Sequence, residues 1–308
     1  MANIVRDTFL QELIGRHGAL RKLGANQSLY ELEGSKVRLY IRYSKIHEQK
    51  RAFYGLRALD LKLLEGHPSL ICFLSDNIKE PLLVPFVEFE EVFRSVTHAS
   101  DGQFKVQVFV QDGITELYIA NAGRFNVESY LGWGAIETLI GSSLLKVPIL
   151  SHSQVQTLLG AIGAKKGYEV WVPIVDRSKL DWTIVEKFGC GDTLPPSLNK
   201  ITRIVEEIDV IWLQRGGSVK ALFEVEHSTP IYSGLLRFND VHLVSPQSNL
   251  TFSIVSNEER RSTYVQQLNR PTFQVSGLHS VCNFLEYSNV FGWHERLRRM
   301  KDEKATYL

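Results

Sequence analysis

The stretch EEIDVIWLQRGGSVKALFEVEHSTPIYSGLLRFND, residues 206–240, decides the fold of the C-terminal half of the chain. It contains two runs rich in β-branched and aromatic residues, 208–213 and 219–226, which are typical of β-strands. Between them lies Gln-Arg-Gly-Gly-Ser, a segment rich in turn-forming residues. The stretch therefore predicts a β-hairpin.

Three acidic residues stand inside this hairpin: Asp209, Glu224 and Glu226. Carboxylates are depleted from strands and cost free energy when buried unpaired, so they need a compensating group such as a cation. Side chains alternate along a strand, so Glu224 and Glu226 share one face while Val225 points into the core. If Asp209 faces the same side, three carboxylates converge. Alternatively, Asp209 lies at a sheet edge, and Glu224 and Glu226 pair with Lys220 or Arg237 on a solvent-exposed face of the sheet.

Convergent carboxylates of this kind suit Mg²⁺, as one or two ions. A bound Mg²⁺ neutralises charge on a phosphodiester and lowers the pKa of a bound water molecule. The three acids therefore favour phosphodiester hydrolysis over proton abstraction or acyl transfer.

The rest of the C-terminal half alternates helical and strand patterns. Before the hairpin we predict a helix at 153–166, capped by Ser153, and a strand at 168–175. After the hairpin we predict a helix at 232–243, a strand at 250–255, a helix at 259–268, a strand at 280–285 and then a basic terminal helix. This order predicts an α/β (α+β) domain, a sheet covered by helices.

Asp209, a gap, and Glu224-Val225-Glu226 at the end of an apolar strand resemble the motif of the PD-(D/E)xK nuclease superfamily. The resemblance covers only the C-terminal half, and it implies a restriction-endonuclease-like mixed sheet flanked by helices. It also implies that Asp209, Glu224 and the Val225 carbonyl bind the metal. The third motif position is usually Lys, and here it is Glu226. This departure leaves open the identity of the base and the number of metal ions.

Three further residues are auxiliary candidates. His227 follows the Glu-Val-Glu segment and would contact the scissile phosphate or a carboxylate, unless it is an ordinary histidine at a strand end. Gln156 and Arg237 lie on the helices predicted before and after the hairpin, where they would point at the centre or at DNA. Five other histidines show no spacing typical of metal ligands: His47, His67, His98, His152 and His294.

The N-terminal half is predicted to be a β-rich domain with a few helices. A second hairpin is expected at 28–33 and 36–43, and its returning strand alternates apolar and basic residues. The basic residues of this region are interleaved with aromatic ones, a combination that suits a DNA phosphate backbone: Lys36, Arg38, Arg42, Lys45, Lys50, Arg51 and Arg57. The alternative is a solvated strand face followed by a charged loop. We expect a recognition domain at 1–140 and a nuclease domain at 145–308.

The bulk composition leaves these hypotheses open and excludes others. The 308 residues, 44% hydrophobic and 22% charged, are typical of a globular protein with two domains, and a net charge of +1 does not exclude a local basic patch. Three widely spaced cysteines indicate neither a disulfide framework nor a zinc site. Because we find no signal peptide, membrane span or nucleotide-binding GxxxxGK[ST] loop, we expect a cytoplasmic protein without membrane or nucleotide partners.

The leading hypothesis is a Mg²⁺-dependent, type II-like restriction endonuclease that acts on double-stranded DNA. Cutting both strands would favour a homodimer. Two alternatives remain open: a DNA-binding module that keeps the nuclease fold without cleavage, and a nuclease directed at RNA, since phosphate chemistry is shared.

Overall fold

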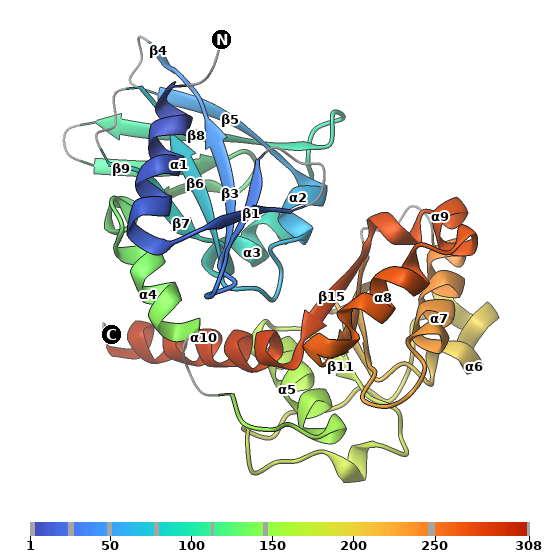
Figure 1. Cartoon of the computed structure of the whole chain (residues 1–308). Helices are drawn as coiled ribbons and strands as arrows, with labels where there is room; N and C mark the ends of the chain where they lie inside the picture. The colour runs from blue at the N-terminus through green and yellow to red at the C-terminus, as the bar shows by residue number, and fades with distance from the viewer. Residues whose placement is uncertain are drawn as a thin grey trace. The chain divides into compact units, whose positions relative to one another are not determined.

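A computed structural model describes residues 4–23, 28–47, 51–76, 80–111, 114–143, 147–245 and 250–306 (Figure 1). Internal contacts divide the chain into two compact units, residues 1–146 and 147–308. Across the described residues, every helix is too short or too polar to cross a lipid bilayer.

The first unit is built on two sheets, each five-stranded over the described residues. One sheet contains β1 (Leu20–Lys22), β2 (Leu29–Leu32), β3 (Arg38–Tyr43), β6 (Ser69–Leu74) and β7 (Leu82–Pro85), in that order. The other contains β10 (Gly123–Asn126), β9 (Ile114–Ile119), β8 (Gln103–Gln111), β5 (Arg51–Arg57) and β4 (Ile46–His47). The predicted hairpin is the antiparallel pair β2 and β3. The prediction of a β-rich N-terminal part is confirmed.

Apolar side chains of both sheets share one core, in which Tyr54 of β5 meets Phe73 of β6 edge-on at 4.9 Å between ring centroids. The helices of this unit are α1 (Ile4–His17), α2 (Ala58–Lys62), α3 (Phe86–Ser95) and α4 (Gly134–Ser143). Helices α1 and α4 pack on the other face of the first sheet through buried residues such as Leu13 and Ile136. The unit thus has two sheets around one core, to which α2 and α3 contribute, and α1 and α4 cover the other face of the first sheet.

The second unit is a single mixed sheet over its described residues. Its strand order is β11 (Glu169–Trp171), β12 (Val210–Leu213), β13 (Val219–Val225), β14 (Thr251–Ser256) and β15 (Cys282–Glu286). The first three strands are antiparallel neighbours, and β13, β14 and β15 are parallel. The hairpin predicted from residues 206–240 is therefore the centre of the sheet.

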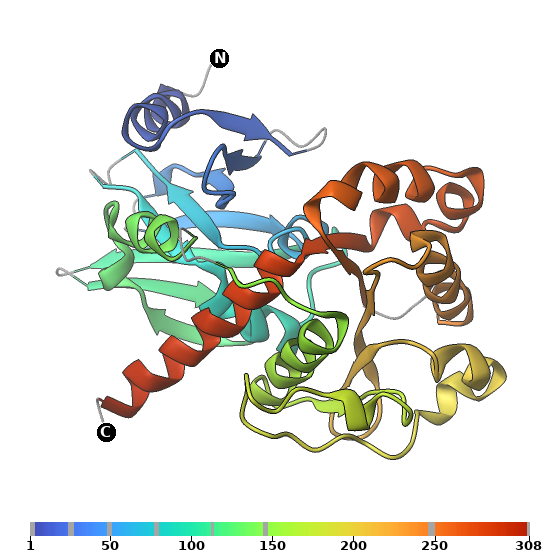
Figure 2. The same ribbon diagram turned by 60° about the horizontal axis from the view of Figure 1, so that its bottom comes forward.

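Helices cover both faces of this sheet, as Figure 2 shows. The helices are α5 (His152–Lys165), α6 (Thr202–Val205), α7 (Ile231–Val244), α8 (Arg261–Leu268), α9 (Pro271–Ser276) and α10 (Tyr287–Thr306). On one face, α7, α8 and α9 share a core with Leu222, Phe252 and Phe284. On the other face, α5 and α10 pack beside each other. The predicted α/β (α+β) class, with a mixed sheet flanked by helices, is confirmed.

Trp212 anchors the face under α5. Its indole nitrogen donates a hydrogen bond to the carbonyl of Leu159 at 3.0 Å, and its ring lies 5.4 Å from that of Trp293. Helix α5 approaches so closely that a Cβ at Gly163 would lie 2.4 Å from the indole nitrogen. A glycine is required there, and this close contact fixes the distance between α5 and the hairpin.

Several details differ from the sequence-based expectations. The predicted strand 168–175 is shorter, because β11 ends at Trp171. The polar segment 121–126, whose sequence indicates either a binding loop or a surface connection, contains the edge strand β10. Strand β3 is buried on both faces at its start, so Arg38 is not part of an exposed positive face: its guanidinium pairs with Glu31, opposite it on β2. Because other residues pack on both sides of β3 there, its side chains do not alternate between buried and exposed as the sequence pattern predicts.

Candidate active site

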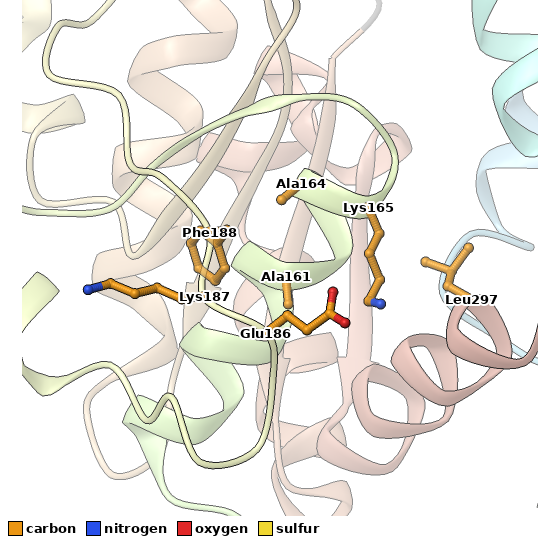
Figure 3. A pocket seen from close by; sticks show the side chains of 7 residues that line it. All are labelled: Ala161, Ala164, Lys165, Glu186, Lys187, Phe188 and Leu297. Atoms are coloured by element: carbon orange, nitrogen blue, oxygen red, sulfur yellow. The ribbon is translucent and has the colours of Figure 1, made fainter. Parts of the chain in front are cut away.

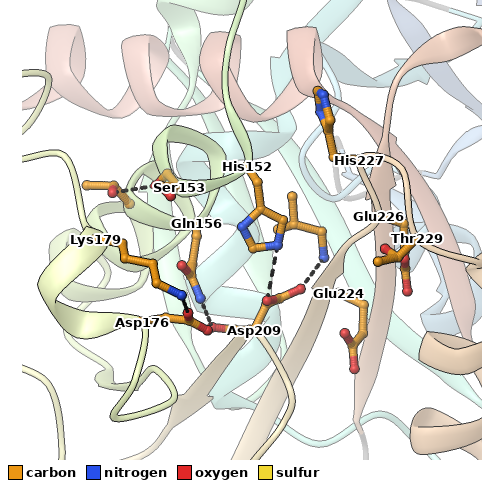
Figure 4. A network of polar contacts seen from close by, with 12 residues as sticks. His152, Ser153, Gln156, Asp176, Lys179, Asp209, Glu224, Glu226, His227 and Thr229 are labelled. Atoms are coloured by element: carbon orange, nitrogen blue, oxygen red, sulfur yellow. Dashed lines mark hydrogen bonds and ion pairs between the residues drawn. The ribbon is translucent and has the colours of Figure 1, made fainter.

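The three acids of the hairpin line one cavity of about 450 Å³ in the second unit. Asp209 directly precedes β12, Glu224 is near the end of β13, and Glu226 follows that strand. The cavity is also lined by Arg237 and by His152, which Figure 4 shows beside Asp209. The antiparallel pairing of β12 and β13 brings Asp209 beside the end of β13, as the hairpin predicted.

Asp209 is held through both its side chain and its backbone. Its Oδ2 accepts a hydrogen bond from the amide of Val225 at 2.7 Å. Its Oδ1 lies 3.3 Å from Nε2 of His152. Its carbonyl accepts a hydrogen bond from the side-chain amide of Gln156 at 2.9 Å. Gln156 therefore positions Asp209 from α5.

Glu224 forms a two-point ion pair with Arg237 of α7. Arg237 Nε lies 2.6 Å from Oε1 of Glu224, and Nη2 lies 2.9 Å from Oε2. Glu224 is only 1% exposed, and burial raises the pKa of its carboxyl group to about 8, although the neighbouring guanidinium opposes this rise. The carboxylate in turn raises the pKa of Arg237. Figure 4 shows the Glu224 carboxylate directed away from Asp209.

Glu226 is also buried, at 2% exposed, but within the described residues only one of its two carboxylate oxygens accepts a hydrogen bond. Its Oε2 accepts a hydrogen bond from the hydroxyl of Thr229. Its Oε1 is buried and has no hydrogen-bond partner among the described residues. A Cβ at Gly234 of α7 would lie 2.7 Å from this oxygen, so glycine leaves room beside it. Burial raises the pKa of this carboxyl group as well.

The three carboxylates share a cavity, but they do not form a ready-made metal site. Within the ranges that the structure describes, no group of three or more His, Cys, Asp or Glu side chains is arranged to hold a metal ion. The convergence expected from strand alternation is therefore incomplete, because Arg237 binds the Glu224 carboxylate. The donor set still fits a divalent cation, since it offers carboxylate oxygens and one of them, Glu226 Oε1, is buried without a partner in the described part of the chain.

His152 is a residue of this site that the sequence reasoning missed. Helix α5 begins with Ser151 as its cap, in a reciprocal arrangement with Gln154, two residues before the predicted cap at Ser153. His152 therefore starts the helix instead of belonging to the preceding loop, and its ring reaches Asp209. The Asp209 carboxylate raises the pKa of His152. A capping box Ser-x-x-Gln at 151–154 was the signal that would have located it.

The loop after β13 is held by residues from three other elements: a 3₁₀ turn, β14 and α10. Arg260, at the end of a 3₁₀ turn (Glu258–Arg260), donates hydrogen bonds to the carbonyls of Glu226 and Thr229, each at 2.5 Å. The Ser256 hydroxyl donates to the Glu226 carbonyl at 2.6 Å. His227 Nδ1 lies 3.2 Å from the hydroxyl of Tyr287, and the two rings are stacked. His227 lines the cavity, but its ring contacts this tyrosine and not a carboxylate.

A second cavity, of about 360 Å³, lies along the C-terminal half of α5 (Figure 3). It is lined by Ala161, Ala164, Lys165, Glu186, Lys187, Phe188 and Leu297. Glu186 is the single carboxylate in this lining, so the cavity offers no set of metal ligands. The cavity at the end of β13 is therefore the better candidate for chemistry.

The basic residues of the first unit are distributed over both of its sheets. Arg42 lies on β3, with its guanidinium 5.7 Å from the ring centre of Tyr40. Arg51 lies on β5, 4.9 Å from that of Phe53, and Arg57 ends the same strand, exposed. Lys36 is half-buried and Lys45 is exposed. Lys50 lies outside the described residues.

The family model described as the C-terminal domain of the type II restriction enzyme NmeDI matches residues 146–305 of this chain. This range contains the whole mixed sheet and the acid-lined cavity. The chain belongs to this restriction-enzyme family.

A curated relative is the type II restriction enzyme NmeDI of Neisseria meningitidis serogroup C, which is 32% identical over 133 residues. The match covers 40% of this chain and 37% of the relative. The chain thus matches little more than a third of the length of this relative. The comparison with solved structures found no match. The family is therefore shown for the unit that carries the acids, and the geometry of the cavity comes from the structure alone.

Proposed function

We propose that the chain is a Mg²⁺-dependent DNA endonuclease of the restriction type, which hydrolyses phosphodiester bonds in double-stranded DNA. Membership of the NmeDI C-terminal domain family supports a restriction role for the second unit. The observation that carries the chemistry is the cavity at the end of β13, where Asp209, Glu224 and Glu226 lie together. Buried acids beside a surface cavity are the arrangement that a divalent cation and a phosphate group would satisfy together.

The oxygen donors that the chain offers to Mg²⁺ are the carboxylates of Asp209, Glu224 and Glu226 and the carbonyl of Val225. When bound, Mg²⁺ would neutralise charge on the phosphodiester and make hydroxide available near neutral pH. The side chains around these donors hold them in place. Gln156 and His152 contact Asp209, while Arg260 binds the loop that carries Glu226. Arg237 and His227 supply further groups for the phosphate.

For the first unit we propose DNA binding through the basic residues of 36–57, which includes β3 and β5. Lys36, Arg42, Lys45 and Arg51 would contact the phosphate backbone, and Lys50 and Arg57 complete the set. Arg38 would contribute only by breaking its buried pair with Glu31. A homodimer would place two such chains on the two strands of DNA.

The test is cleavage of plasmid DNA by the purified full chain with Mg²⁺, compared with the same reaction in EDTA. Asp209→Ala and Glu224→Ala should each reduce the rate on the order of a hundredfold or more, because loss of even a supporting group around a metal costs ten- to a hundredfold. Lys187→Ala, in the lining of the second cavity, is the matched control and should cleave like the wild type. Cleavage that survives both acidic substitutions would overturn the assignment of the site.

A second candidate, a DNA-binding module without cleavage, is favoured by one observation. Glu224 is occupied by Arg237, and no group of three ligands is preformed among the described residues. This candidate predicts that the wild-type protein binds DNA but leaves plasmid, linear and methylated substrates intact in Mg²⁺. Products from any of these substrates would exclude it.

A further inference from the structure

We infer that the segment 172–180, which follows β11, contacts DNA beside the cleavage site through the exposed aliphatic side chains of Ile174 and Val175. These side chains would pack against deoxyribose rings and base edges, which are the apolar parts of a DNA groove. The inference rests on the proposed endonuclease function and adds to it a contact that involves no phosphate group.

The segment 172–180 begins at the edge of the sheet where the candidate active site lies. Trp171, the last residue of β11, pairs with Ile211 of β12, and Asp209 stands two residues before Ile211. The chain therefore leaves the sheet at the same edge as Asp209. The pKa of His152 is raised first by Asp209 and further by the charge of Asp176, so the segment also lies close to this histidine of the cavity.

Arg177 holds the segment in one conformation. Its guanidinium donates hydrogen bonds to the carbonyl of Val172 at 3.1 Å and to the carbonyl of Gly191 at 2.5 Å. The same group lies 3.0 Å from the carboxylate of Asp192 and 5.3 Å from the ring centre of Trp171. These contacts fix the segment before a ligand binds, which lowers the entropy cost of binding.

Ile174 and Val175 stand on a turn of this segment and are 69% and 73% exposed. The amide of Asp176 closes the turn by donating a hydrogen bond to the carbonyl of Pro173 at 2.9 Å. The exposed lysine of the segment, Lys179, lies 2.7 Å from the carboxylate of Asp176 and is therefore already paired. A single exposed aliphatic residue is ordinary, but two neighbours on a fixed turn form a preorganised apolar contact.

DNA is the partner that this position favours. The family of the second unit is that of a restriction enzyme, so the cavity at the end of β13 would receive a phosphodiester of DNA. A phosphodiester held there carries its neighbouring sugars and bases to the edge of the sheet where the segment stands. Proteins that bind in a DNA groove often place aliphatic side chains against sugars and bases, and burial of both side chains would add affinity.

The experiment measures fluorescence anisotropy of labelled plasmid fragments with the full chain, at several salt concentrations and in Ca²⁺ to slow cleavage. The double variant Ile174→Ser/Val175→Ser should bind about tenfold more weakly. The slope of log K against log salt should stay unchanged, because aliphatic side chains release no counterions. Val275→Ser, on α9, is the matched control, since this aliphatic residue is 90% exposed, and it should bind like the wild type. Thermal unfolding shows that each variant is folded.

A direct readout of contact is a photo-crosslink. With p-benzoylphenylalanine in place of Val175, ultraviolet light should link the protein to bound DNA, whereas the same group in place of Val275 should give no link.

Three results would overturn the inference: wild-type affinity in the double variant, weaker binding with a reduced salt slope, or a change in the sedimentation of the protein without DNA. The second result would indicate lost phosphate contacts, and the third would assign the aliphatic pair to a protein interface. A wild-type protein that binds no DNA would overturn the proposed function together with this contact. A wild type that binds DNA without cutting it would overturn cleavage alone, and the comparison of affinities and slopes would still test the segment.

Discussion

Two buried arginine–glutamate pairs, one in each unit, differ in what surrounds them. In the first unit, Glu31 and Arg38 lie opposite each other on β2 and β3, 3.3 Å apart, and Arg21 adds a second cation to Glu31 at 2.5 Å. In the second unit, Glu224 and Arg237 join a strand to a helix beside two more carboxylates. The carboxylate of Glu31 is bound by two arginines. Glu224, in contrast, belongs to a group of three acids that has fewer bound cations than carboxylates.

The comparison teaches that burial of an ion pair does not identify a functional site. The pair of Glu31 and Arg38 ties neighbouring strands, as cross-strand opposite charges do. The surroundings of Glu224 differ because the acids there exceed the cations bound to them, and Glu226 keeps an oxygen unsatisfied by the described residues. An excess of buried negative charge at a cavity is the feature that calls for an external cation.

The largest effect should come from breaking the pair in the second unit. Arg237→Met leaves Glu224 buried without its cation and should lower the free energy of unfolding by about 3–5 kcal/mol. Urea denaturation measures the loss. The double variant Glu224→Leu/Arg237→Met should recover most of it, and a loss below about 1 kcal/mol in the single variant would show that the pair is not a structural support.

The equivalent change in the first unit should cost less. Arg38→Met removes one cation from Glu31, but Arg21 remains within 2.5 Å, so we expect a loss of about 1–3 kcal/mol. Removing both arginines should cost more than the sum of the single changes, because Glu31 then loses both of these cations. Equal losses for Arg38→Met and Arg237→Met in the same denaturation experiment would remove the distinction between the two pairs.

The half-buried basic residues Lys36, Arg42 and Arg51 of the first unit should affect DNA binding more than stability. Replacing Lys36, Arg42 and Arg51 together by Gln should weaken binding about tenfold and reduce the slope of log K against log salt by about 0.9 for each lost phosphate contact. Fluorescence anisotropy at several salt concentrations measures both quantities. Lys105→Gln, which removes an exposed lysine paired with Asp101, is the control. An unchanged slope would move DNA recognition elsewhere.

The last expected effect is a pH dependence of stability. Burial raises the folded-state pKa of Glu224 to about 8 from an ordinary value of 4.5, so the folded protein retains the proton more strongly than the unfolded chain. The wild type should therefore lose stability relative to Glu224→Gln as the pH rises from 4.5 to 8, by up to a few kcal/mol. Unfolding is measured in EDTA. A difference that changes in the opposite direction would show that Arg237 keeps Glu224 ionised into the acidic range.

The predictable part of the fold comes from local periodicity. The hairpin of β12 and β13, the helices α5 and α7 and the parallel strands β14 and β15 were expected close to their observed positions, because alternation and helical spacing act within single segments. Short elements were less visible: β10 and α9 have few residues and a polar or proline-marked sequence. The sequence predicts the cap of α5 at Ser153, two residues after the observed cap Ser151, so it does not predict that His152 begins the helix.

The candidate site also has one part that the sequence predicts and another part that depends on the tertiary structure. The sequence alone determined that Asp209, Glu224 and Glu226 would stand at one end of a central hairpin, because pairing and alternation follow from the order of residues along two adjacent strands. Only the tertiary structure decided that Arg237 closes Glu224, that His152 and Gln156 hold Asp209, and that one oxygen of Glu226 is left without a partner among the described residues. These partners come from α5 and α7, and a hydrogen bond depends on distances between segments that no local pattern specifies.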